Sequence, residues 1–173
     1  MADGTFAALL LVAGLIDMGA DHCGTVAGCL GQTREGPRLS LSAGEVLERQ
    51  AAPGAELYLR YDTGLRTGPF GHAAGVSVGE RGEVWAGYGA TWATDFGGSP
   101  FYAELHAMPG LYRPGDGLDL GGPIVFRSGI ELGWEAGSGW RLGLAYDHRS
   151  NAGLHDRNPG VETVQLRVSV PLK

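Results

Sequence analysis

The sequence is poor in charge, poor in cysteine and free of long apolar runs. Charged residues make up 18% of the chain, and the net charge is −6. An acidic chain of this kind offers no basic surface, so no nucleic-acid partner is expected. No apolar run approaches the roughly 20 residues that a membrane-spanning helix needs. This leaves open a membrane-spanning β-barrel, because the lipid-facing residues of such a barrel alternate with polar ones along each strand.

Cys23 and Cys29 are the only cysteines in the chain. They would either form a small-loop disulfide in an oxidising compartment or be removed with an N-terminal leader. Two cysteines without a supporting histidine cluster make a poor metal site, so no metal centre is expected.

Residues 1–32 are predicted to be an N-terminal leader, although an atypical one. Residues 6–16 (FAALLLVAGLI) have the length of a signal-peptide apolar region. The segment before them carries Asp3 and neither lysine nor arginine, and residues 26–29 (VAGC) resemble a lipoprotein processing box that lies too far downstream. We therefore expect an export signal of uncertain cut site, followed by a single domain at 33–173.

Glycine is abundant, with 31 of 173 residues, which argues against long helices and suits short strands joined by tight turns. From residue 37 onward, alternating apolar runs recur between clusters of Gly, Pro, Asp and Ser, as in a series of antiparallel strands. The sequence predicts eight strands, at 38–47, 55–62, 70–80, 84–96, 101–112, 126–136, 140–151 and 162–172.

Each predicted strand has one apolar face and one face that mixes glycine with charges of both signs. In a small soluble barrel the apolar face would point inward, whereas in an outer-membrane barrel it faces lipid. Glycine on the mixed face favours the membrane version, because about eight strands enclose a space only wide enough for side chains. The predicted fold class is all-β, an eight-stranded antiparallel up-and-down transmembrane β-barrel. A soluble sandwich or a lipocalin-like barrel is the alternative.

Two further patterns fit this barrel. Three tryptophans near strand ends share the apolar face, as in an interfacial aromatic girdle; they are Trp92, Trp134 and Trp140. Charges on the mixed faces predict ion pairs inside the barrel, with Arg127, Arg141 and Arg167 facing Glu56, Glu131 and Glu135.

Connection lengths predict an orientation in which both ends of the barrel domain are periplasmic. The periplasmic connections would be 63–69, 97–100 and 137–139, and the long extracellular ones 113–125 and 152–161. The short connection at 81–83 breaks the pattern. This orientation puts the end of the strand at 140–151 at the level of the outer leaflet.

The strand at 140–151 carries a histidine and a serine on its apolar face. His148 and Ser150 are two residues apart and point the same way, with roughly 7 Å between their Cα atoms. A base next to a hydroxyl is the minimum that an activated serine nucleophile needs. Glu162, on the next strand, shares the parity of its apolar residues and would lie across from this pair or diagonal to it. A carboxylate facing lipid is costly, and orienting a catalytic histidine would account for it.

Residues 148–162 resemble the signature of the lipid A 3-O-deacylase (PagL) family, whose members are eight-stranded outer-membrane barrels. The matching positions are His148-Arg149-Ser150-Asn151-Ala152-Gly153, then Asn158-Pro159-Gly160, then Glu162. By this resemblance Ser150 is the nucleophile, His148 its base and Glu162 the acid that orients the histidine. Asn151 and the backbone N–H of Gly153 would form the oxyanion hole, the group of donors that stabilises the negative oxygen of the transition state.

The resemblance implies an outer-membrane carboxylic ester hydrolase that removes the ester-linked 3-hydroxyacyl chain at position 3 of lipid A, without cofactor. Its partners would be lipopolysaccharide as substrate and the lipid of the outer membrane. Arg113, Arg149 and Arg157 near the outer rim would meet lipid A phosphates. The chain departs from the family pattern in its leader and in its end, Val-Pro-Leu-Lys instead of an aromatic residue. The alternative is a non-enzymatic outer-membrane barrel with a structural or lipid-binding role.

Overall fold

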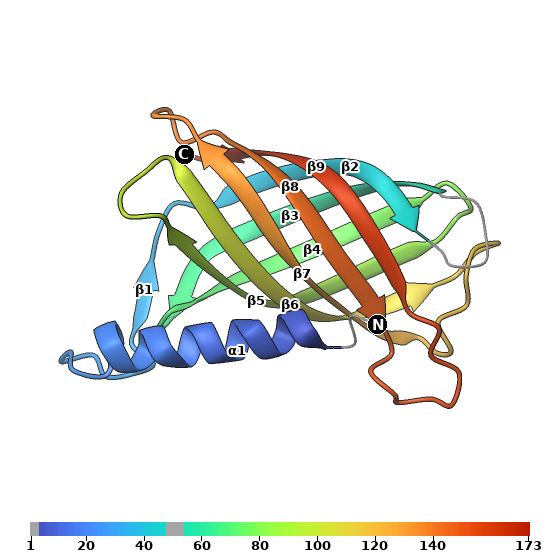
Figure 1. Ribbon diagram of the computed structural model, residues 1–173, viewed down its shortest axis with the longest axis horizontal. Helices are drawn as coiled ribbons and strands as arrows, with labels where there is room; N and C mark the ends of the chain where they lie inside the picture. The colour runs from blue at the N-terminus through green and yellow to red at the C-terminus, as the bar shows by residue number, and fades with distance from the viewer. Residues whose placement is uncertain (1–3, 48–53) are drawn as a thin grey trace.

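In the computed structural model, which describes residues 4–47 and 54–173, the chain forms a closed antiparallel β-barrel (Figure 1). Each barrel strand pairs with the next along the chain, and β9 pairs with β2, which closes the barrel. This confirms the predicted fold class. The barrel strands are β2 Arg38–Leu47, β3 Gly54–Thr67, β4 Phe70–Gly79, β5 Val84–Asp95, β6 Phe101–Arg113, β7 Ile124–Glu135, β8 Arg141–Ser150 and β9 Val161–Pro171.

The β3 strand differs from its prediction because it continues to Thr67 instead of ending at residue 62. Its register against β4 shifts between Asp62 and Arg66, and Gly64 adopts a φ of 75° within this irregular stretch. A bulge of this kind interrupts the alternation on which the prediction rested. The extension also pairs with a short strand that the sequence did not predict, β1 at Gln32–Arg34.

The alternation of exposed and buried residues shows which face points outward. On β3, Leu57 is 59% exposed on the outer wall, whereas Tyr58 is fully buried inside the barrel. The same holds on β8, where Leu142 and Leu144 are exposed and Ala145 is buried. The outer wall is therefore apolar and the interior polar, which is the arrangement of a transmembrane barrel.

The predicted ion pairs form inside the barrel. Arg127 Nη2 lies 3.0 Å from Glu56 Oε1, Arg167 Nη1 pairs with Glu131, and Arg141 Nε pairs with Glu135. Because the buried groups of the first two pairs neutralise one another, the barrel can hold them away from water, whereas Arg141 and Glu135 stay 24% and 35% exposed.

Large aromatic rings fill the interior where the neighbouring strand has glycine. Tyr58 lies over Gly75, and a Cβ atom added at Gly75 would lie 2.3 Å from the Tyr58 hydroxyl oxygen. Trp85, which is fully buried, occupies the space beside Gly110 in the same way, and its Nε1 donates to the Val125 carbonyl at 3.0 Å. The interior glycines thus provide space for these rings, as the composition suggested.

We expect the substitution Gly75→Ala to destabilise the barrel by about 1–3 kcal/mol, because the new methyl group overlaps the Tyr58 ring. The measurement is the free energy of unfolding from a urea titration in micelles. Gly137→Ala is the matched control, since a Cβ atom there meets nothing within 4 Å. Equal stability of the two variants would contradict the packing described here.

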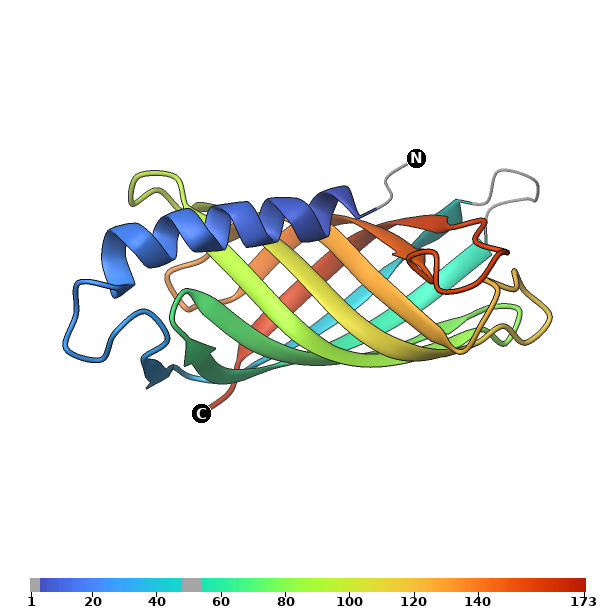
Figure 2. The same ribbon diagram turned by 90° about the horizontal axis from the view of Figure 1, so that it is seen from below.

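An N-terminal helix, α1 at Thr5–Asp17, lies along the outside of the barrel and contacts β5, β6 and β7 (Figures 1 and 2). It is held by a hydrogen bond from Trp92 Nε1 to Asp17 Oδ2 at 2.7 Å and by an edge contact between the rings of Phe6 and Tyr146. With the following turn it forms a helical stretch, Thr5–His22, which by length and composition alone is apolar and long enough to cross a membrane, in contrast to the expectation from the sequence that no segment is. A signal sequence near an N-terminus has the same properties, so the leader at 1–32 stays a prediction; its first three residues lie outside the described part of the chain.

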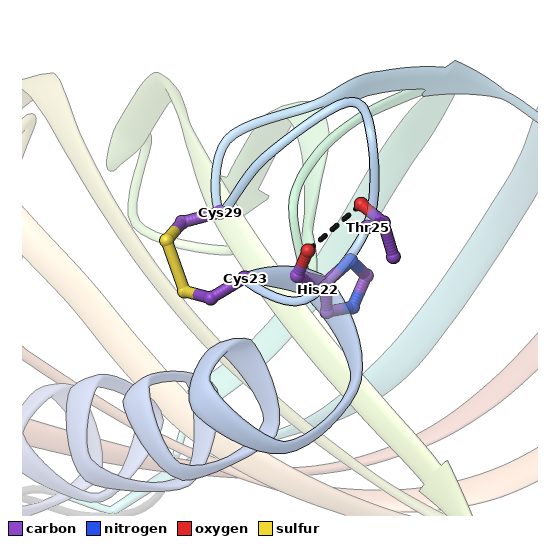
Figure 3. Close-up of a disulfide and its surroundings, with 4 residues drawn as sticks. All are labelled: His22, Cys23, Thr25 and Cys29. Atoms are coloured by element: carbon purple, nitrogen blue, oxygen red, sulfur yellow. Dashed lines mark hydrogen bonds between the residues drawn. A yellow bond between two sulfur atoms is a disulfide. The ribbon is translucent and has the colours of Figure 1, made fainter.

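After this helix, a turn of π-helix at Met18–His22 leads into a loop closed by the disulfide between Cys23 and Cys29 (Figure 3). Thr25 Oγ1 donates to the His22 carbonyl at 2.8 Å within the same loop. Cys23 and Cys29 therefore form the small-loop disulfide that is one of the two alternatives predicted from the sequence.

The long connections gather at one end of the barrel. Figure 1 shows the β6–β7 and β8–β9 loops together at the end where β8 finishes, and the C-terminus with the β7–β8 turn at the opposite end. The candidate site at the end of β8 therefore lies among the long loops.

Candidate active site

His148 and Ser150 lie at the end of β8, on the face of the strand that forms the outer wall of the barrel. His148 lies opposite Glu162 on β9 and opposite Ser128 on β7, while Ser150 lies opposite Phe126. The predicted parity is thus realised, since the exposed Leu142 and Leu144 lie on the same face of the strand. Both catalytic candidates are only 6–7% exposed, because the β8–β9 loop and the start of α1 pack beside them.

Glu162 lies on the same outer wall and faces the histidine. Its Oε1 is 3.4 Å from His148 Nδ1, and the carboxylate side chain is 18% exposed. This is an ion-pair distance, longer than the best hydrogen bonds, and catalytic contacts commonly tighten when substrate binds. Because Nδ1 faces Glu162, Nε2 is the ring nitrogen that would accept a hydrogen bond from a neighbouring hydroxyl.

A groove of about 460 Å³ opens on the outer wall next to these residues. Ser150 and His148 line it together with Phe126 and Ser128 of β7, and the N-terminal helix contributes Ala7. The sequence had assigned no role to Phe126 or Ser128. Parity placed both on the outer face, but only the strand register shows that they lie beside the histidine and the serine.

The turn after Ser150 is organised by the Asn151 side chain, which is fully buried. Its Nδ2 donates to the carbonyls of Leu120, at 2.8 Å, and of Arg157, at 2.7 Å. Its Oδ1 accepts the N–H of Gly153 at 2.9 Å. Asn151 therefore ties the β8–β9 loop to the β6–β7 loop, and the two residues predicted for the oxyanion hole bond to each other.

Asn158, which the sequence analysis gave only as a position of the family signature, takes part in the same network. Its Oδ1 accepts the backbone N–H of Asn151 at 3.1 Å. A second close contact joins the loops at Gly121, where an added Cβ atom would lie 1.8 Å from the Arg157 carbonyl oxygen. The turn after Ser150 is thus fixed both by Asn158 and by the contact between the two loops.

Gly160 packs directly against His148. It adopts a φ of 66°, a left-handed conformation that favours glycine, and a Cβ atom there would lie 2.9 Å from His148 Cε1. A glycine at this position therefore leaves the imidazole room beside the β8–β9 loop.

The three arginines expected near lipid phosphates have different surroundings. Arg149 points into the barrel and pairs with Glu56 at 2.6 Å, so its predicted role at the outer rim is wrong. Arg149 is adjacent to His148 on β8, and successive side chains of a strand point to opposite faces, so Arg149 lies on the interior face. Arg113 is exposed, and Arg157 lies 3.6 Å from Asp119 in the neighbouring loop. Within residues 4–47 and 54–173, no group of three or more His, Cys, Asp or Glu side chains could hold a metal ion.

The fold and the site together define a transmembrane β-barrel of the outer-membrane type that carries a serine, a histidine and a glutamate on its outer wall. The profile of the family "Lipid A 3-O-deacylase (PagL)" matches residues 52–171. The chain therefore belongs to the lipid A 3-O-deacylase family, and the match includes every residue predicted for the site.

Individual relatives support the same assignment. The lipid A deacylase PagL of Bordetella bronchiseptica (strain ATCC BAA-588 / NCTC 13252 / RB50) is 32% identical over 87 residues, which cover 49% of this chain and 49% of that protein. The chain thus spans about half the length of this curated relative.

Two solved structures have the same fold. The crystal structure of the outer membrane enzyme PagL matches with a TM-score of 0.63 and 23% identity, over 78% of this chain and 99% of the other. The crystal structure of Neisserial surface protein A matches with a TM-score of 0.56 and 14% identity, over 82% of this chain and 99% of the other. At these identities both structures support the barrel fold alone.

Proposed function

We propose that this chain is an outer-membrane carboxylic ester hydrolase that removes the ester-linked 3-hydroxyacyl chain at position 3 of lipid A. Membership of the lipid A 3-O-deacylase family supports the substrate and the reaction. The observation that carries the mechanism is the meeting of Ser150, His148 and Glu162 on the outer wall, beside an open groove. Lipid A in the outer leaflet could reach this groove laterally, without entering the barrel.

The proposed reaction needs only these side chains and water. Ser150 Oγ attacks the ester carbonyl carbon, its proton passes to His148 Nε2, and the carbonyl electron pair moves onto oxygen. Glu162 beside Nδ1 stabilises the imidazolium and fixes its orientation. When the intermediate collapses, the sugar oxygen leaves and takes the proton from His148. Water then hydrolyses the acyl-serine in the same way, and the 3-hydroxy fatty acid is released.

Backbone or side-chain N–H groups in the turn 151–153 would stabilise the negative oxygen of each tetrahedral intermediate, and the family resemblance assigns this role to Asn151 and Gly153. The long loops next to the site would then face outward, which puts Ser150 at the level of the outer leaflet. Arg113 at the end of β6 and Arg157 in the β8–β9 loop are available for lipid A phosphates.

The N-terminal segment at 1–32 would be the export leader in this scheme. Its helix covers part of the groove through Ala7, and it exposes apolar side chains to the surroundings, among them Leu11, Val12 and Ile16. Removal of this segment would widen access to Ser150.

The substrate is tested with purified protein in detergent and two synthetic lipid A molecules, one with the natural ester at position 3 and one with an amide there. Mass spectrometry should show loss of a single 3-hydroxyacyl chain from the ester and no change in the amide. If a chain is lost from any other position, the proposed specificity is wrong. If folded protein leaves the ester intact, the non-enzymatic barrel is favoured.

We expect Glu162→Gln to lower kcat by about 10²- to 10⁴-fold, because the neutral amide no longer stabilises the imidazolium and can hold the wrong tautomer. The KM should change little, since Glu162 need not contact substrate. The control is Glu135→Gln, at the other end of the barrel, where the carboxylate pairs with Arg141 far from the site. Equal activity of the two variants would exclude Glu162 from the mechanism.

A further inference from the structure

The turn after Ser150 presents four backbone N–H groups, and three of them have partners within the β8–β9 loop. Asn151 N donates to Asn158 Oδ1 at 3.1 Å, Gly153 N to Asn151 Oδ1 at 2.9 Å, and Leu154 N to the Asn151 carbonyl at 3.0 Å. These N–H groups would have to break good hydrogen bonds before they could stabilise an oxyanion.

The side-chain carboxamide of Asn151 already has hydrogen-bond partners as well. A carboxamide has two N–H bonds to donate. The Nδ2 atom of Asn151 donates to the Leu120 carbonyl at 2.8 Å and to the Arg157 carbonyl at 2.7 Å. Because the side chain is also fully buried, it is poorly placed to donate to a substrate in the groove.

The N–H of Ala152 is the fourth group, and it points at the nucleophile. It lies 3.4 Å from Ser150 Oγ, a long and weak contact. The oxygen that becomes the oxyanion is bonded to the carbon that Oγ attacks, so it develops its charge close to Oγ. An N–H aimed at Oγ before the reaction is therefore close to the oxyanion afterwards.

The backbone of Ala152 is held in an uncommon conformation. Its φ is 53°, and it is the one non-glycine residue with positive φ in the described part of the chain. A residue in this region costs free energy and persists only where the surroundings enforce it, often at functional sites. Here the neighbours on both sides, Asn151 and Gly153, are fixed by the network around the Asn151 side chain.

We propose that the backbone N–H of Ala152 is the main oxyanion donor. Asn151 is then a positioning residue, whose hydrogen-bonded side chain keeps this N–H in place. The inference rests on the proposed esterase function and deepens it. In the acylation step the Oγ–C bond forms, the Oγ proton goes to His148, and the oxygen that receives the carbonyl electron pair accepts the Ala152 N–H.

The direct test replaces the amide at residue 152 by an ester, with lactic acid in place of alanine, by semisynthesis and refolding. This removes the N–H and keeps the side chain. We expect kcat for lipid A deacylation to fall by roughly 10²-fold or more, with KM little changed, because the donor acts mainly on the transition state. The same replacement at Gly153 should lower kcat less, since that N–H is donated to Asn151.

An ester at Gly137, in the turn at the opposite end of the barrel, is the matched control for the chemistry of the substitution. Heat-dependent mobility on gels and circular dichroism show whether each protein has folded. The proposal is overturned if the folded 152 ester keeps kcat within about threefold of the natural protein, or if the 153 ester loses more. If the natural protein does not deacylate lipid A, or does so without Ser150, the proposed function itself has failed.

The positioning role of Asn151 is tested by combining Asn151→Ala with the ester at 152. Each change alone should lower kcat, and together they should lower it little further, because both act through one N–H. The acid limb of the pH–rate profile should keep its midpoint, since the His148–Glu162 pair is untouched. Losses that multiply would show that Asn151 acts independently of Ala152, contrary to the proposal.

Discussion

Ser150→Ala should reduce lipid A deacylation by a factor on the order of 10⁶, which is the typical effect of removing the serine from a Ser-His-acid triad. The alanine variant lacks the oxygen that forms the acyl-enzyme, and the remaining groups can only bind and polarise the ester. The measurement is the rate at which 3-hydroxy fatty acid is released from lipopolysaccharide in detergent. The barrel itself should be unaffected, because Ser150 lines the groove on the outer wall and belongs to none of the interior ion pairs described above.

Ser128→Ala is the informative control, because two hydroxyl groups lie beside His148, the proposed base. Ser128 lies opposite His148 on β7 and lines the same groove as Ser150. We expect its loss to cost less than about tenfold in rate, or roughly 1.4 kcal/mol. A Ser128→Ala variant without activity beside an active Ser150→Ala variant would mean that the nucleophile was assigned to the wrong strand.

Glu56→Ala should have the largest effect on stability, about 3–5 kcal/mol, because it leaves buried arginines without their carboxylate. Glu56 is 2% exposed and accepts contacts from Arg127 at 3.0 Å, from Arg149 at 2.6 Å and from Gln165 at 2.7 Å. The free energy of unfolding in micelles measures the effect.

Two comparisons sharpen this prediction. Glu56→Gln keeps an acceptor for the same donors and should cost less than the alanine variant. Glu35→Ala removes a carboxylate that is 64% exposed and 3.6 Å from Arg66, and it should change stability by less than about 0.5 kcal/mol. If Glu56→Ala is as stable as Glu35→Ala, water must reach the interior pairs, and the description of a filled barrel would need revision.

The barrel could be predicted from the sequence because its two faces differ at nearly every position. Alternation located all eight barrel strands and the interior pairs of Arg127 and Arg167, and it put His148 and Glu162 on one wall. Parity determines the face on which a side chain lies, and it carries no information about neighbours on the next strand. For that reason Ser128 and Phe126 were found only from the register.

Features that depend on irregular backbone could not be predicted. The extension of β3 follows a bulge near Gly64, where the alternation is lost. The short strand β1 pairs with this extension, so it could not be predicted without it. The inward turn of the Asn151 side chain depends on the Leu120 carbonyl, about 30 residues away in another loop. A sequence motif names such a residue without showing which of its atoms faces the substrate.

The central claim is that an outward-facing serine on the barrel wall removes one acyl chain from lipid A. Mass spectrometry of lipid A from cells that express this chain, or its Ser150→Ala variant, tests it most directly. Cells with the natural chain should show lipid A lighter by one ester-linked 3-hydroxyacyl group at position 3, and cells with the variant should show none of this product. Unchanged lipid A beside a folded barrel in the outer membrane, or the same mass loss in both strains, would contradict the account.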